Sequence, residues 1–219
     1  MINFEEIKKN KEIEIFLETA DKNFAAIGYK EHGFRHALTS ANVSGEILKS
    51  LGYPARDVEL AKIAGYLHDI GNALGENDHP QTGGVLALNI LRKMGMPYTD
   101  IFKTTIAIGS HEDKENNPPN NICAAVILGD KSDVHRMRVR KTDLKTFDTH
   151  DRVNYSTTES VVKVNSEKKL ITLNLTIDTK ICSVMEYFEI FLSRMKFCKI
   201  AANFLNCNFE LYINNDKMF

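Results

Sequence analysis

Hydrophobic positions recur every three to four residues over the first two-thirds of the chain, which is the spacing of one buried face of a helix. Glycine and proline residues divide this pattern into about six helices. They are expected over residues 4–27, 34–51, 54–71, 80–94, 99–111 and 122–137. The NNPPNN stretch separates the last two, because paired prolines cannot continue a helix. This part of the chain is therefore predicted to be an all-helical bundle.

After residue 148 the hydrophobic period changes to two. Ile171, Leu173, Leu175 and Ile177 alternate with polar residues, as in a half-buried strand. A β-branched segment over residues 153–164 and a last segment over 209–213 predict two more strands. Between them, Asp178 or Thr179 is expected to cap a long helix, whose apolar face carries Ile181, Val184, Met185, Phe188, Leu192 and Met195. The fold class is therefore mainly α, with a helical domain over residues 1–147 and a small α+β region (strand, strand, helix, strand) over 148–219.

The apolar face of this hairpin needs a cover, because an isolated hairpin is marginal in water. The long helix that follows can supply it within one chain. The alternative is that the hairpins of two chains pair and form a homodimer through the C-terminal region. In either case the region is expected to be separable from the chemistry, and a fragment that ends near Phe147 is expected to bind metal.

Charge and cysteine usage restrict the partners. Twenty-eight basic and twenty-nine acidic residues give a net charge of −1, so no global field attracts nucleic acid or an anionic membrane. The four cysteines include no C-x-x-C pair and indicate a reducing compartment. The N-terminus is too acidic for a signal peptide, and residues 181–204 carry too many charges for a membrane span. We expect a cytoplasmic protein without a membrane partner, for which nucleic acid is an unfavoured ligand.

Histidine and aspartate form an ordered series in the helical part, where six of the seven histidines lie. Imidazole and carboxylate together favour borderline or hard divalent ions. Two of the aspartates end apolar runs, where a buried carboxylate needs a partner such as a metal ion. The pair His32 and His36 has helical spacing, but Gly33 indicates that the helix begins after His32. The series comprises His36, His68, Asp69, His79, His111 and Asp130.

The segments around this series carry a family resemblance. FRHALTSANVSGEIL, IAGYLHDIGNALG, DHPQTGG, AIGSHED and AAVILGDKSD resemble the HD-domain family of metal-dependent phosphohydrolases, over about half of the chain. The resemblance implies a helical bundle in which His36, His68, Asp69 and Asp130 bind one ion. It further implies that His79 and His111 bind a second ion, with Asp69 as the bridge. The ions would be Mn, Fe, Ni, Co, Mg or Zn, two per chain.

The resemblance also implies a reaction, the hydrolysis of a phosphate ester or anhydride by a metal-activated hydroxide, commonly in a nucleotide. Asp69, Lys131 and Asp133 are the candidate catalytic residues, with Asp133 as a group that orients water or a ligand. Arg35, Lys131 and Arg136 are the candidate phosphate-binding residues, although the RMRVRK run is also typical of a solvated helix end. The alternative function is a catalytically silent nucleotide-sensing module that keeps the pocket.

Overall fold

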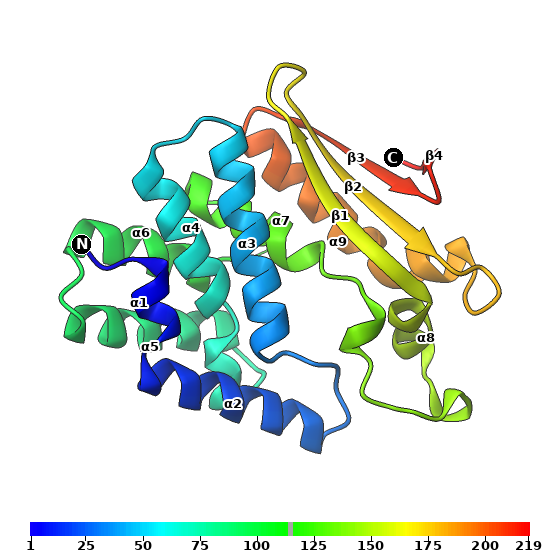
Figure 1. The fold of residues 1–219 in the computed structure, drawn as a ribbon, viewed down its shortest axis with the longest axis horizontal. Coiled ribbons are helices and arrows are strands. Elements are labelled where there is room, and N and C mark those ends of the chain that lie inside the picture. The colour runs from blue at the N-terminus through cyan, green and yellow to red at the C-terminus, as the bar shows by residue number, and fades with distance from the viewer. Residues whose placement is uncertain (114–115) are drawn as a thin grey trace.

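The helical part follows the predicted order. A computed structural model describes residues 1–113 and 116–219, and Figure 1 shows a helical bundle beside a sheet with its own helices. The fold class is confirmed as mainly α with a small C-terminal appendage. The bundle consists of α1 (Phe4–Lys8), α2 (Lys11–Ala26), α3 (Phe34–Ser50), α4 (Ala55–Leu67), α5 (His79–Lys93), α6 (Tyr98–Gly109) and α7 (Asn121–Lys131), with a 3-10 turn η1 (Ile70–Ala73) after α4.

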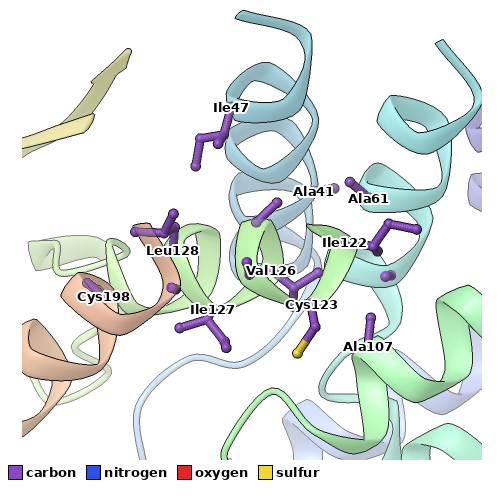
Figure 2. Close-up of a cluster of buried hydrophobic side chains, with 14 of the residues drawn as sticks. Ala41, Ile47, Ala61, Ala107, Ile122, Cys123, Val126, Ile127, Leu128 and Cys198 are labelled. Atoms are coloured by element: carbon purple, nitrogen blue, oxygen red, sulfur yellow. The ribbon is translucent and has the colours of Figure 1, made fainter. Parts of the chain in front are cut away.

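Helix α7 lies at the centre of the bundle. All of its side chains from residue 122 to residue 131 are buried. Figure 2 shows small neighbours around it, among them Ala41 of α3, Ala61 of α4 and Cys198 of α9 (Val184–Phe204). A Cβ on Gly129 would lie 2.5 Å from the Ser44 hydroxyl oxygen, so the glycine allows α3 to approach closely. This packing draws the last turn of α7, which carries Asp130, into the interior.

Three expected helices differ from the structure. The expected helix over 54–71 ends at Leu67, and the 3-10 turn η1 follows it. The expected helix over 4–27 is two helices, because the Asn10 side chain accepts hydrogen bonds from the backbone N–H groups of Glu12 and Ile13 and so starts α2. The expected helix over 122–137 ends at Lys131. Beyond this helix end, Asp133 forms ion pairs with Arg35 and His36. Arg136–Arg138 then forms a separate 3-10 turn, η2.

The C-terminal region begins with a helix that the sequence pattern missed. Residues 153–156, expected as strand, belong to α8 (Thr149–Ser156), which a capping box between Asp148 and Asp151 starts. A 3-10 turn, η3 (Leu144–Thr146), precedes it. The strands are β1 (Thr157–Asn165), β2 (Leu170–Ile177), β3 (Asn208–Ile213) and β4 (Asp216–Lys217). Their order is β1-β2-β3-β4, with β2 and β3 parallel and the outer pairs antiparallel.

Helix α9 connects the two parallel strands and begins later than expected. Ser183, not Asp178 or Thr179, caps it by accepting a hydrogen bond from the Glu186 backbone N–H. Its buried face differs as well, because Met185 is 68% exposed and Leu192 is 39% exposed, whereas the side chains of Tyr187, Phe191, Met195, Cys198, Ala201 and Ala202 are buried. No helix within the described ranges has both the length and the apolar character that crossing a bilayer requires.

The hairpin face is covered within the chain. Ile171, Leu173, Leu175 and Ile177 are at most 3% exposed and share one hydrophobic core with α7 and α9. The cover that a second chain could have supplied is therefore present already, and a dimer would have to use another surface, such as the free edge of β1. The dimer and the domain boundary at residue 147 stay predictions.

Candidate metal centre

Five helices bring the six predicted ligands to one point. His36 comes from α3, His68 and Asp69 follow α4, His79 opens α5, His111 follows α6, and Asp130 lies in the last turn of α7. Each of the six is at most 9% exposed. Buried imidazole and carboxylate groups at this density need each other or a cation as partners.

Asp69 stands between two pairs of histidines. Its Oδ2 lies 3.6 Å from Nε2 of His36 and 3.3 Å from Nε2 of His68. Its Oδ1 lies 3.3 Å from Nε2 of His79 and 4.0 Å from Nε2 of His111. The two oxygens of one carboxylate therefore face two different sets of nitrogen atoms.

Three groups of residues could each hold a metal ion, and within each group the potential ligand atoms lie within 4.8 Å of one another. The first joins His36 and His68 to Asp130, whose Oδ1 is 3.4 Å from Nε2 of His36. The second group is His68, Asp69 and His111, and the third is His79, His111 and Glu112. Glu112 was not predicted as a ligand, and its position next to His111 in the sequence was the available signal.

The outer ring nitrogens fix the direction of the four rings. Each Nδ1 donates a hydrogen bond to an oxygen outside the cluster, which leaves the Nε2 lone pair directed inward. The acceptors are the Gly65 carbonyl for His68 (2.8 Å), the Glu76 carbonyl for His79 (2.9 Å), the Ile108 carbonyl for His111 (2.7 Å) and the Asp133 carboxylate for His36 (2.6 Å).

This arrangement fits divalent metal ions. The Nε2 atoms of His36 and His68 lie 3.2 Å apart, so two inward lone pairs face each other unless a proton or a cation lies between them. The buried Nε2 of His111 has no hydrogen-bond partner among the described residues. Imidazole nitrogens held by outer hydrogen bonds, next to carboxylate oxygens, are the donor set of Zn, Fe, Ni, Co or Mn.

The electrostatics of the cluster keep its carboxylates ionised. Burial alone would raise the pKa of Asp69, but the charge and hydrogen bond of His68 bring it well below its usual value. Burial would also raise the pKa of Asp130, but the charge of Lys131 is the main cause that brings it well below its usual value. Burial and the charges of His68 and Lys131 lower the pKa of His111 to about 4. His111 is therefore neutral at pH 7 and able to donate its lone pair.

Of the predicted catalytic and phosphate-binding residues, the structure brings only Asp69 and Lys131 to the cavity next to the cluster. The Lys131 ammonium group lies 2.5 Å from Oδ2 of Asp130 and 2.8 Å from Oε1 of Glu112. The Arg35 guanidinium binds both carboxylate oxygens of Asp133 instead, at 3.0 and 2.8 Å. Asp133 thus contacts the His36 ring from the side away from the cluster, and it is not among the residues that line the cavity.

Arg136 also lies away from the cavity. Its guanidinium stacks over the Tyr155 ring, 5.4 Å from the ring centroid. Among the described residues, neither Arg35 nor Arg136 lines the cavity that contains Asp69 and Asp130. A lysine or arginine that is close to a predicted ligand in the sequence is thus not necessarily close to the cavity in the structure.

The cavity measures about 370 Å³ and is lined by residues from distant parts of the chain. Asp69, His79, Asp130 and Lys131 form part of its wall. Arg138 of the RMRVRK run also lines it, and sequence analysis missed three further basic residues of the lining, namely Lys30, His150 and Arg194. The signal for His150 was its position as the single histidine of the C-terminal region. Lys30 and Arg194 had no signal, because only the fold brings them to this wall.

Comparison with known proteins agrees with this geometry. The profile of the HD domain matches residues 33–152, which is more than half of the chain. The chain belongs to the HD domain family. HD domains bind divalent metals, and membership in the family supports a metal-dependent hydrolase.

Individual relatives are distant. Over 110 residues the HD protein is 28% identical to an uncharacterized protein of Methanocaldococcus jannaschii, and this match covers 43% of the chain and 42% of the relative. Ribonuclease Y of Staphylococcus epidermidis is 29% identical over 119 residues, and that of Desulfotalea psychrophila is 30% identical over 122 residues. Each covers 54% of the chain and 21% of the ribonuclease. The chain thus matches less than half of the length of these relatives.

Among solved structures, the chain matches that of a predicted HD superfamily hydrolase from an uncultured Thermotogales bacterium. It is 22% identical, with a TM-score of 0.47, and the match covers 61% of the chain and 75% of that protein.

Proposed function

We propose that this HD protein hydrolyses a phosphate ester or anhydride of a small molecule, with nucleotides as the substrate class, and that it holds two divalent ions. The observation that carries the proposal is the position of Asp69, whose two oxygens face separate histidine pairs. His36, His68 and Asp130 would hold one ion with Asp69, and His79 and His111 the other. Because four of the six donors are imidazoles, we favour Mn, Fe, Co, Ni or Zn over Mg.

The residues of the chain have separable roles in this reaction. Two divalent ions in such a centre supply a water of lowered pKa and polarise the phosphoryl oxygens for in-line displacement. Lys131, held by Asp130 and Glu112 at the cavity, is placed to donate hydrogen bonds to a phosphoryl oxygen and to offset the charge that develops there. Asp133 keeps the His36 ring oriented.

The size of the cavity and the net charge of the chain support a small substrate. A cavity of about 370 Å³ is within the range that takes small molecules, and the net charge of −1 gives no general attraction for nucleic acid. The ribonuclease Y relatives are named for action on RNA, but they share only a fifth of their length with this chain. The four cysteines are free and buried, which supports a reducing, cytoplasmic location.

The test is a screen of the purified full-length chain with each of Mn, Fe, Co, Ni, Zn and Mg. Substrates include nucleoside mono-, di- and triphosphates, phosphodiesters and a short RNA, and Asp69→Asn is the matched inactive control. Release of phosphate or nucleotide with at least one metal is expected. Measurable nucleotide binding without turnover by any metal would instead support the sensing module, and cleavage of RNA alone would contradict the small-molecule substrate.

A further inference from the structure

The cavity next to the His/Asp cluster has a second, basic part that comes from outside the predicted ligand series. Lys30 precedes α3, His150 lies in α8, and Arg194 lies in α9. All three line the same cavity as Asp69 and Asp130. The C-terminal region therefore adds two basic side chains to a cavity whose predicted ligands all lie before residue 131.

These three basic groups lie around one buried aromatic ring, that of Phe191. The Phe191 side chain is 1% exposed, and the Lys30 ammonium lies 5.8 Å and the Arg194 guanidinium 4.8 Å from its centroid. The His150 ring centroid is 6.4 Å from the same ring. The Lys30 ammonium is also 3.2 Å from Nδ1 of His150. We call Lys30, His150 and Arg194 the basic wall.

Within the described residues the basic wall has no ion pair with a carboxylate, and the opposing charges, Asp130 and Glu112 for Arg194 and Asp148 and Asp151 for Lys30, act without direct contact. Within residues 1–113 and 116–219, no hydrogen bond or ion pair is seen for the Arg194 guanidinium, although it lines the cavity. Two of the carboxylates that line the same cavity, Asp148 and Asp151, are bound by Lys141, at 3.5 and 2.5 Å. Burial and the charges of Arg194 and Arg138 lower the pKa of Lys30 to about 7. An anion at this wall would relieve that repulsion.

Lys131 differs from the basic wall in its neighbours. It contacts Asp130 and Glu112 and is thus placed for the phosphoryl group that reacts. Within the described ranges the basic wall forms no hydrogen bond or ion pair with a predicted metal ligand, although the charge of Asp130 acts on Arg194. The two sets of cations are therefore suited to two different anionic groups of one ligand.

We propose that Lys30 and Arg194 bind a second phosphate group of the substrate, one that is not cleaved, so that the substrate class is an organic diphosphate or polyphosphate. This inference rests on the proposed function, because it assigns the cleaved phosphate to the His/Asp cluster. His150 positions Lys30 through the hydrogen bond between them. Charge-assisted hydrogen bonds from both cations would select this ligand over a monophosphate.

Calorimetric titration of the metal-loaded, full-length chain tests the inference without turnover. The probes are methylenediphosphonate, which carries two phosphonate groups on a bond that is not hydrolysed, and methylphosphonate, which carries one. Arg194→Gln and Lys30→Gln should each weaken binding of the diphosphonate by about tenfold or more, the value of a lost hydrogen bond to a charged group, and that of the monophosphonate by less than about twofold. Arg92→Gln, an exposed arginine in α5, is the matched control and should change neither.

Two binding results would overturn the inference. Equal weakening of both probes would mean that the wall binds the reacting phosphate, and unchanged diphosphonate binding in Lys30→Gln would mean that it binds no phosphate. Lys30→Gln decides the question if Arg194→Gln does not fold, as judged by circular dichroism and metal content. If the unaltered chain hydrolyses phosphate esters and the variants bind the diphosphonate unchanged, only the inference is contradicted. If the variants lose diphosphonate binding selectively but the unaltered chain shows no turnover, only the proposed function is contradicted.

Discussion

At the scale of the residue, three of the candidate ligands share one local device. His68, His79 and His111 each donate Nδ1–H to the carbonyl oxygen three residues earlier in the chain. His68 and His111 follow helix ends, where the last carbonyl groups lack helical partners, and the Glu76 carbonyl that His79 uses lies just before α5. The same backbone geometry therefore fixes both the tautomer and the direction of three imidazoles, before any metal ion binds.

Asp69→Asn should abolish the binding of both ions. A neutral amide is a poor bridge between two cations, and each of the two sites depends on one of the carboxylate oxygens. His79→Ala should loosen one ion and leave the other in place. Elemental analysis of the purified proteins measures both effects, with Asp216→Asn at the exposed end of the sheet as control. Two ions per chain in Asp69→Asn would contradict the bridging role.

Lys30 should make the free energy of unfolding increase as the pH rises above about 7. Its pKa is lowered from 10.5 to about 7 by burial and by Arg194 and Arg138, opposed in part by Asp148 and Asp151. Between about pH 7 and 10 the unfolded chain therefore binds more protons at this residue, so stability rises with pH there. Below pH 7 the folded chain carries the full cost of the buried charge.

Replacing this lysine should remove the cost. Lys30→Gln is expected to be more stable than the unaltered chain at pH 6, by about 1 kcal/mol once solvent screening is allowed for, and the difference should shrink as the pH rises to 10. Urea unfolding at several pH values measures it, with the exposed Lys145→Gln as control. A gain that is equal at pH 6 and pH 10 would show that the charge of Lys30 is not its cause.

At the scale of the element, the close approach of η1 to α5 places His79. A Cβ on Gly71 would lie 2.0 Å from the His79 carbonyl oxygen and 2.7 Å from the Gly83 nitrogen, both backbone atoms that cannot rotate away. The absence of a side chain at Gly71 thus allows α5 to begin against the segment that follows Asp69. The distance between Asp69 and His79 depends on this contact.

Gly71→Ala should therefore separate the two elements. We expect a loss of roughly 1–3 kcal/mol in the free energy of unfolding, as for overpacked cores, together with loss of one metal ion because His79 moves. Gly109→Ala is the matched control, since its added Cβ would meet only the Pro80 carbonyl oxygen at 3.9 Å. Denaturation and elemental analysis measure the two effects, and a Gly71→Ala protein with unchanged stability and two ions would refute the steric argument.

At the scale of the whole molecule, the C-terminal region both covers the bundle and completes the cavity. Cys198 of α9 lies beside α7 in Figure 2, and α9 also carries Arg194 of the cavity wall. The proposed ligands all lie before residue 131, whereas part of the basic wall lies after residue 147. Metal binding and substrate binding are thus expected to depend on different parts of the chain.

A fragment that ends at Phe147 should still bind metal, because the helices that carry the ligands pack on one another. It should aggregate, since removal of α9 exposes the apolar side of α7. Elemental analysis and the binding of a hydrophobic dye measure the two properties, with the full-length chain measured alongside. A monomeric fragment without metal would contradict the expected separation, and sedimentation of the full chain tests the dimer through the C-terminal region.

The sequence alone determined the helical bundle and the ligand series. Helical spacing, the change to a period of two and the aspartates that end buried runs are local signals, because burial repeats with the geometry of each element. These signals could therefore single out the series of histidines and aspartates, and the family resemblance implied which of them would share an ion.

Only the tertiary structure decided which cations reach the cavity. Arg35 and Arg136, near the ligand series, are held by Asp133 and Tyr155, whereas Lys30 and Arg194, more than 160 residues apart in the chain, line one wall. Local signals also failed at α8 and at the start of α9, where side-chain caps outweighed the hydrophobic pattern. The direction of a long charged side chain depends on the partners that packing brings near it, and these partners come from elements that no local pattern connects.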